Sequence, residues 1–320
     1  MAGRPIEERF QGSLEKLIPG FAGSAAHLGI AVSGGPDSMA LLALGHHVWP
    51  GRIRAATVDH GLRSESADEA AMVADYCAAQ NIPHNVLHPA RPITGNLQSG
   101  ARAARYALLN DWAAQNECLW IATAHHSDDQ LETLLLRLAR GAGLDGLSGV
   151  RAINGNIVRP LLDFRKAELL EYCAVHAIPH VHDPSNANID FDRVRMRHAL
   201  ESLDMLDAVA ANRSARSLAD AGTALDWVVM READAYVLRD GNAVTLGNTD
   251  YPTEVLRRLL LHCIALLAPG TQPRGESIMR ALAALKAGEK TMIGDILCAG
   301  GSVWRFRPAP PRSGEKPRAS

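Results

Sequence analysis

Short apolar runs alternate with helical segments through the first half of the chain, and this alternation restricts the fold more than any other feature. Four of the runs have the character of β-strands: 28–32, 53–58, 82–88 and 119–124. The segments between them carry helix-forming residues at helical spacing. Strands that alternate with helices pair in parallel through right-handed crossovers. The sequence therefore predicts an α/β fold with a doubly wound parallel sheet and helices on both faces.

The second half of the chain has a different organisation. A fifth strand is predicted at 156–162, but from about Leu203 the sequence is mostly helical. The exception is a predicted hairpin at 291–306 that turns at Gly300 and Gly301. We therefore expect a larger domain followed by a smaller, mostly helical one. The predicted bounds are 1–205 for the larger domain, 206–305 for a helical linker with the smaller domain, and 306–320 for a disordered basic tail.

The composition and the termini limit the class of protein. The net charge of −2 argues against general charge-driven binding of nucleic acid, although it permits a basic patch for one structured partner. The five cysteines include no Cys-x-x-Cys pair, which argues against a disulfide framework, a zinc site and an iron–sulfur cluster. Neither a signal peptide nor a membrane-spanning run is recognisable. We predict a reduced, cytoplasmic protein that does not bind membranes.

A polar turn, Ser33-Gly34-Gly35-Pro36-Asp37-Ser38, separates the first predicted strand from the next helix. Ligands of parallel sheets bind beyond the carboxyl ends of strands, where such turns lie. The glycines let the backbone approach an anion, Pro36 suits the first helical position, and the free N–H groups of the first turn attract a phosphate. Asp37 would repel that phosphate unless a divalent cation lay between them, so we infer Mg²⁺ at Asp37. The alternative is a tight turn in which Asp37 only complements the helix dipole.

Polar clusters also follow two further predicted strands. The segment 59–63 (Asp-His-Gly-Leu-Arg) follows the second strand, and 125–129 (His-His-Ser-Asp-Asp) follows the fourth, with Glu132 one helical turn later. Taken alone, the second cluster is better explained by two packing histidines followed by acids at a helix start than by a site. The carboxyl ends of parallel strands share one edge of a sheet, so we expect all three clusters to meet there. Their coincidence favours a nucleotide site.

The motifs together resemble those of the tRNA(Ile)-lysidine synthetase family, within the PP-loop ATP-pyrophosphatase superfamily. Six motifs match in order over roughly the first 200 residues. They are SGGPDS (33–38), VDHGLR (58–63), ARAARY (101–106), TAHHSDDQLET (123–133), RPLL (159–162) and DPSN (183–186). One departure is Val194, which replaces the asparagine of the family's Arg-Asn-x-x-Arg motif in the segment 193–197.

The resemblance implies a reaction and its partners. The segment 1–205 would be a PP-loop ATP-binding catalytic domain, and 206–305 would include the family's small tRNA- or substrate-binding domain. ATP would activate the C2 oxygen of the wobble cytidine in a CAU-anticodon tRNA(Ile), with release of pyrophosphate. The ε-amine of free L-lysine would then displace AMP to give lysidine. We leave the oligomeric state open, including a homodimer.

The resemblance also implies roles for residues at the predicted edge. The turn at 33–38 would cradle the pyrophosphate of ATP, with Asp37 holding Mg²⁺. Val58 would lie along the adenine or ribose, and Arg63 would either contact a phosphate or remain solvated. Asp129 and Glu132 share a helical face and would recognise lysine, unless they are only an acidic first turn. His126 is expected beside these acids, while the group that deprotonates lysine is not identified by the sequence.

Five arginines are candidates for contacts with phosphates. Arg102 and Arg105 would support a phosphate of AMP or tRNA, or else form a solvated stripe over Tyr106. Arg193, Arg195 and Arg197 alternate with apolar residues and would contact tRNA phosphates.

Three other functions remain as alternatives. The first is another PP-loop tRNA-modifying enzyme such as a thiolase, which the lack of Cys-x-x-Cys pairs disfavours. The second is a metal-dependent phosphohydrolase that uses His125, His126, Asp128 and Asp129, but it leaves the turn at 33–38 unexplained. The third is a non-catalytic nucleotide-binding regulator, which would bind ATP without releasing pyrophosphate.

Overall fold

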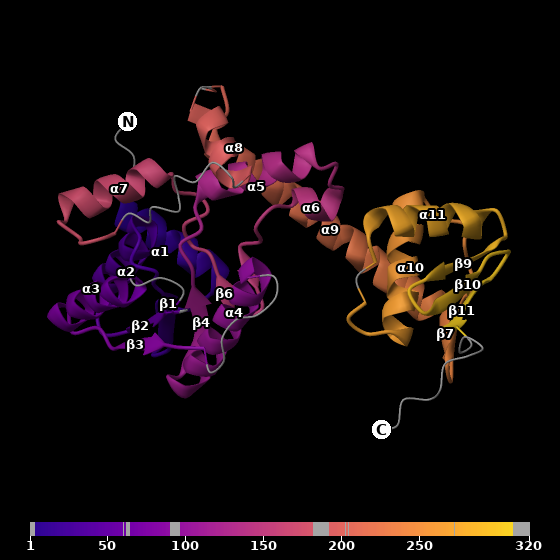
Figure 1. The fold of residues 1–320 in the computed structure, drawn as a ribbon, viewed down its shortest axis with the longest axis horizontal. Helices are drawn as coiled ribbons and strands as arrows, with labels where there is room; N and C mark the ends of the chain where they lie inside the picture. Colours follow the sequence, from indigo (N-terminus) through magenta and orange to yellow (C-terminus); the bar gives the residue numbers. More distant parts are fainter. Residues whose placement is uncertain are drawn as a thin grey trace. The chain divides into compact units, whose positions relative to one another are not determined.

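The computed structural model describes residues 4–59, 61, 65–89, 97–181, 192–201, 203, 205–271 and 273–309. The chain forms two compact units, Met1–Ala219 and Asp220–Ser320 (Figure 1). The division lies within the long helix α9 (Ala208–Tyr236). No helix in the described part of the chain is long and apolar enough to cross a membrane.

The first unit contains a six-stranded sheet in the order β3-β2-β1-β4-β6-β5. All neighbouring strands pair in parallel except β5, which is antiparallel to β6. This arrangement confirms the predicted α/β class. The strands are β1 (His27–Ala31), β2 (Ile53–Val58), β3 (His84–Leu87), β4 (Cys118–Ala122), β5 (Ile153–Asn154) and β6 (Ile157–Val158).

Helices cover both faces of this sheet because its strands alternate between two cores. Leu28 and Ile30 of β1 point into the larger core, which α1, α2, α3 and α7 complete. Ala31 points into a smaller core on the other face, where α4 contributes Leu109 and Trp112. The helices are α1 (Ile6–Leu17), α2 (Pro36–Val48), α3 (Glu65–Ala79), α4 (Leu97–Gln115) and α7 (Lys166–Val175).

Three further helices of the first unit stand near the carboxyl edge of the sheet. Helix α5 (Ser127–Ala139) follows β4 directly and packs against α6 (Leu144–Leu147) and α8 (Asp192–Glu201). Helix α8 carries the arginine-rich motif, and Val194 within it is only 5% exposed. An apolar side chain at this position therefore has a packing role in this chain.

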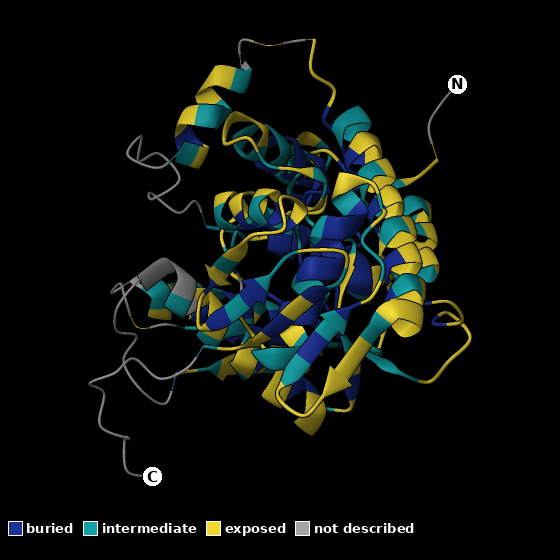
Figure 2. Cartoon of the chain, turned by 90° about the vertical axis from the view of Figure 1, so that its right-hand side faces the viewer, coloured by how far each residue is buried: buried dark blue, intermediate teal, exposed yellow. Residues whose placement is uncertain are grey.

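The second unit is built on a five-stranded antiparallel sheet in the order β7-β8-β11-β10-β9. Buried residues alternate with more exposed ones along β8, β10 and β11, whereas most of β7 is exposed. Figure 2 shows the burial of the chain. Strands β10 and β11 form the hairpin predicted around Gly300 and Gly301. The second unit is thus richer in strands than the mostly helical domain that the sequence predicts. Its elements are β7 (Val237–Asp240), β8 (Ala243–Leu246), α10 (Thr253–Leu267), α11 (Gly275–Lys286), β9 (Lys290–Ile293), β10 (Ile296–Ala299) and β11 (Trp304–Pro308).

Gly29 in β1 should contribute to the stability of the first unit because α4 packs closely against it. A Cβ at this position would lie 2.8 Å from the buried ring of Trp112 on α4. We expect Gly29→Ala to lower the free energy of unfolding by about 1–3 kcal/mol, because the ring must move within a packed core. Urea-induced unfolding followed by circular dichroism measures this change.

Gly12 provides the matched control. It lies in α1, and a Cβ there would meet no atom within 4 Å. Gly12→Ala should stabilise the protein by about 0.5–1 kcal/mol through helix propensity. Equal effects of the two substitutions would contradict the close packing of α4 on β1.

Candidate active site

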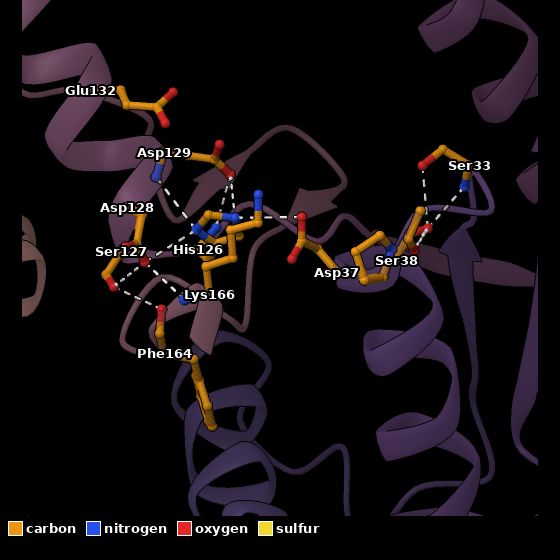
Figure 3. A network of polar contacts seen from close by, with 12 residues as sticks. Ser33, Asp37, Ser38, His126, Ser127, Asp128, Asp129, Glu132, Phe164 and Lys166 are labelled. Atoms are coloured by element: carbon orange, nitrogen blue, oxygen red, sulfur yellow. Dashed lines mark hydrogen bonds and ion pairs between the residues drawn. The ribbon is translucent and has the colours of Figure 1, made fainter. Parts of the chain in front are cut away.

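The turn between β1 and α2 is held by the hydroxyl of Ser38. This buried hydroxyl donates a 2.9 Å hydrogen bond to the Gly35 carbonyl and accepts one of 3.1 Å from the Ser33 N–H (Figure 3). The hydroxyls of Ser33 and Ser38 lie 3.2 Å apart. Ser38 therefore fixes the shape of the turn, whereas Ser33 is exposed at its rim.

The backbone of the same turn is arranged for an anion. Gly34 has a φ of +84°, a conformation that favours glycine, and its carbonyl accepts a 2.9 Å bond from the Val181 N–H. Gly35 is the N-cap of α2 and supplies no side-chain cap, and Pro36 takes the first helical position. The N–H groups of Asp37 and Ser38 belong to the first turn and have no acceptor within the helix. These groups and the helix dipole favour a phosphate.

His126 connects this turn to helix α5. Its Nε2 atom lies 3.5 Å from Asp37 Oδ2 and 3.5 Å from Asp129 Oδ2, and its Nδ1 atom lies 3.5 Å from Asp128 Oδ2 (Figure 3). The side chain is only 3% exposed. One buried imidazole therefore contacts three carboxylates from two segments that are distant in the sequence.

The first turn of α5 is fixed by hydrogen bonds to the backbone at the start of α7. Ser127 is fully buried and donates a 2.7 Å hydrogen bond to the Phe164 carbonyl. Asp128 accepts a 2.8 Å bond from the Lys166 N–H. The N–H of His126 donates to Asp129 at 3.2 Å and caps the helix. These bonds hold the acids of α5 at the edge of the sheet.

The surrounding carboxylates determine the charge of His126. Burial alone would lower its pKa, but the hydrogen bonds to Asp128 and Asp37 and the charge of Asp129 raise the pKa to about 10. Burial also disfavours the Asp128 anion, yet His126 and the Lys166 N–H lower the pKa of that carboxyl to about 2. Nδ1 cannot both donate to Asp128 and accept the 3.4 Å contact from the Asp129 N–H. Three nearby anions favour the imidazolium, in which Nδ1 donates.

The neighbouring His125 has the opposite electrostatic environment. Burial lowers its pKa to about 4, which outweighs the attraction of Asp129, and the charges of Arg159, Arg102 and Arg105 lower it further. Its Nδ1 atom lies 3.1 Å from the Thr123 hydroxyl. His125 is therefore neutral near pH 7, beside a charged His126.

Glu132 is buried and pairs with an arginine of α8. Arg197 binds Glu132 through two nitrogens, and a third contact places it 3.9 Å from Asp129 Oδ1. A pocket of about 330 Å³ opens beside this pair. Its charged lining residues are Asp128, Glu132, Arg165, Lys166 and Arg197, and its apolar ones are Leu131, Leu200, Leu206 and Ala208.

The other predicted site residues are dispersed. Val58 ends β2 at the same edge of the sheet. Arg193 and Arg195 are exposed on α8, and Arg195 pairs with Asp192. Arg63 and the segment 183–186 lie outside the described residues.

His125 is influenced by the charges of three arginines: Arg102 and Arg105 of α4, and Arg159, which was not predicted as a site residue. Arg102 is exposed and Arg105 is half-buried. Arg159 follows β6 and is only 4% exposed. Arg159 is the first residue of the RPLL motif, but the motif alone gives no sign of its burial or its neighbours.

Asp37 fits the role of a magnesium ligand. Its Oδ1 atom is buried and has no hydrogen-bond partner among the described residues. No three His, Cys, Asp or Glu side chains in the described part of the chain form a group that could hold a metal ion. Magnesium in nucleotide sites usually needs only one or two carboxylates, because phosphates and water complete its shell. The residues present therefore fit Mg²⁺ bound together with a nucleotide.

The pKa values of the two adjacent histidines should be shifted in opposite directions from the ordinary value. In metal-free protein, we expect the His126 ring to remain an imidazolium at pH 8 and the His125 ring to remain neutral at pH 5.5. The His126 contribution to folding stability is then complete below a pH of about 6.5 and is lost as the pH rises through about 10, because its folded pKa is raised.

Carbon-13 NMR of labelled histidine rings measures both states. The single variants His125→Gln and His126→Gln assign the two signals. A midpoint near 6.5 for either ring would contradict the described environment.

Comparison with known proteins agrees with this geometry. A family model described as a PP-loop domain matches residues 6–203. The fold is similar to that of a U34-tRNA thiolase from Methanococcus maripaludis, with a TM-score of 0.54, 16% identity, and coverage of 66% of this chain and 77% of that chain. At this identity the likeness concerns the fold alone.

Curated relatives match almost the entire chain. A tRNA(Ile)-lysidine synthase of Zymomonas mobilis is 38% identical, with 97% of this chain and 94% of the relative covered. A tRNA(Ile)-lysidine synthase of Novosphingobium aromaticivorans is 40% identical, with 97% and 96% covered. The PP-loop, the acids around His126 and these matches show that the chain belongs to the tRNA(Ile)-lysidine synthase family of PP-loop proteins.

Proposed function

We propose that the protein uses ATP to join L-lysine to C2 of the wobble cytidine in a CAU-anticodon tRNA(Ile), giving lysidine, AMP and pyrophosphate. One observation carries this proposal: His126 brings the PP-loop carboxylate of Asp37 together with the acids of α5. A phosphate site and an acidic site therefore share one edge of the sheet. The full-length similarity to curated lysidine synthases supports the choice of substrates.

The turn at 33–38 would bind the pyrophosphate portion of ATP. The first-turn N–H groups of α2 and the hydroxyl of Ser33 would bind its oxygens. Ser38 keeps the turn in shape. When bound at Asp37, Mg²⁺ would neutralise the charge of the departing pyrophosphate. The cytidine C2 oxygen attacks the α-phosphorus of ATP, and the bond to pyrophosphate breaks. Val58, at the end of β2, would contact the adenine or ribose.

The pocket beside Glu132 would receive the lysine. Free lysine carries two ammonium groups and one carboxylate, and the pocket offers side chains of both signs. Glu132 and Asp129 fit an ammonium, whereas Arg197 fits the carboxylate. The ε-nitrogen then attacks C2 of the activated cytosine, and AMP leaves with the C2 oxygen. His126 is protonated and cannot accept the proton of the ε-ammonium, but it holds Asp129 and Asp37 in place.

The environment of the cysteines opposes the thiolase alternative. All five cysteines are buried free thiols. Burial raises the pKa of Cys77 and Cys263 to about 12, and that of Cys118, Cys173 and Cys298 to about 11. Sulfur transfer requires a thiolate or a cluster, and protonated buried thiols are poor nucleophiles.

Lysine transfer is the direct test. Purified protein is mixed with ATP, Mg²⁺, labelled lysine and unmodified CAU-anticodon tRNA(Ile), and label in the tRNA is counted. We expect transfer by the wild type and a loss of at least about 100-fold in Asp37→Asn, because this change removes the carboxylate that would hold Mg²⁺ at the departing pyrophosphate. Asp111→Asn, an exposed acid on α4, serves as the control and should retain full activity.

The same assay separates the two substrates. Glu132→Gln should raise the KM for lysine by about 10-fold or more while the KM for ATP stays within twofold, because a buried charge pair to the amino acid is lost. Pyrophosphate release without lysine transfer by the wild type would refute lysine as the nucleophile. Absence of both activities in folded protein would refute the proposed function.

A further inference from the structure

Buried amide side chains join α5 to the beginning of α9. Gln130 of α5 and Asn212 of α9 are each only 2% exposed. The Gln130 Nε2 atom donates a 3.3 Å hydrogen bond to Asn212 Oδ1, and Asn212 Nδ2 donates one of 2.7 Å to Asp163 Oδ1. Asp163 lies between β6 and α7 and also accepts bonds of 2.7 and 2.9 Å from Arg216. We name Gln130, Asn212 and Asp163 the amide chain.

The hydrogen bonds of the amide chain can run in one direction only. A carboxylate only accepts, so Asn212 must turn its Nδ2 atom to Asp163 and its Oδ1 atom to Gln130. Gln130 must then turn its Nε2 atom to Asn212, which leaves its Oε1 atom for the Val150 N–H at 2.6 Å. The same Nε2 atom donates a 3.1 Å bond to the Val150 carbonyl. The orientation of the Gln130 amide is therefore specified by its neighbours.

The loop before Val150 is shaped to admit the Gln130 side chain. Gly149 has a φ of +67°, and a Cβ at this position would collide with the Gln130 amide. Arg137, two helical turns after Gln130 on α5, donates bonds of 3.0 Å to the Gly149 carbonyl and 2.6 Å to the Gly146 carbonyl. Two side chains of α5 thus bind the same loop, which fixes the rotation of the helix about its axis.

Gln130 lies between the two acids of the proposed lysine site. Asp129 directly precedes it, and Glu132 follows two residues later. Residues two apart point to nearly opposite sides of a helix. The bonds of Gln130 therefore hold one side of α5, while Glu132 pairs with Arg197 on the other. A rotation of α5 would displace both acids together, and the amide chain opposes that rotation.

We infer that Gln130 is a positioning residue for lysine transfer, and that Asn212 and Asp163 set its orientation. Gln130 would act on lysine only through Asp129 and Glu132, whose places on α5 it fixes. The inference rests on the proposed function for its substrate. A purely stabilising network would affect the two substrates alike, whereas a positioning network affects lysine and leaves ATP unchanged. The KM values of the two substrates therefore separate these roles.

The direction of the hydrogen bonds provides the test. Asn212→Asp replaces the donor to Asp163 by a second carboxylate, so the KM for lysine should rise by about 10-fold while the KM for ATP stays within about twofold. Adding Asp163→Asn again places an amide opposite a carboxylate, and Arg216, one helical turn after residue 212, can neutralise the new charge. The double variant should return the KM for lysine to within about threefold of the wild type. Gln130→Leu removes every amide bond and should raise this KM by at least as much as Asn212→Asp.

Ser148→Ala is the matched control. The buried Ser148 hydroxyl donates a 2.9 Å bond to the Leu144 carbonyl of α6, so this change removes a buried bond beside the same loop and should leave both KM values unchanged. Asn212→Ala decides the question if Asn212→Asp does not fold, because it removes only the bridge and should still raise the KM for lysine alone.

Two outcomes would overturn the inference. One is an unchanged KM for lysine in the folded Asn212 variants, and the other is an equal rise in the double variant or in Ser148→Ala. Hydrogen exchange of the α5 amides needs no substrate, and it should be faster in Asn212→Asp and slow again in the double variant. Absence of lysine transfer by the wild type would refute the proposed function, whereas the exchange would still decide whether the amide chain fixes α5.

Discussion

The ion contacts of His126 organise the functional edge of this protein. A single imidazolium, 3% exposed, holds the carboxylates of Asp37, Asp128 and Asp129 within 3.5 Å of its ring nitrogens. Without that positive charge, three carboxylates would repel one another in a poorly solvated space. Their attraction to His126 lets the turn after β1 and the helix after β4 approach each other. The phosphate-binding and amino-acid-binding parts of the proposed site depend on this approach.

Charges of opposite sign are separated along the same edge. The acids of the turn at 33–38 and of α5 contact His126, whereas the charges of Arg159, Arg102 and Arg105 act on His125. A cationic substrate and a phosphate-bearing substrate need opposite environments in close proximity. The two adjacent histidines satisfy this need because one is charged and the other is neutral. Their different neighbours, and not their position in the sequence, produce the difference.

Much of this arrangement was predictable from the sequence. The alternation of strands and helices predicted the α/β class, and the polar clusters at 33–38 and 125–129 meet at His126, as expected. The third cluster, 59–63, lies partly outside the described residues. The short strand β7 escaped prediction because three of its four residues are exposed, so it shows no apolar alternation. Contacts between distant segments were also hidden. The sequence did not indicate that Arg197 would pair with Glu132 or that Arg159 would be buried.

In the proposed reaction, ATP activates cytidine, and not lysine, at the edge shared by Asp37 and the acids of α5. The most direct measurement uses tRNA(Ile) with oxygen-18 at C2 of the wobble cytidine. In a single turnover with ATP and lysine, we expect this oxygen to appear in AMP. Oxygen transferred to AMP from the lysine carboxylate, with the label retained in the tRNA, would contradict it.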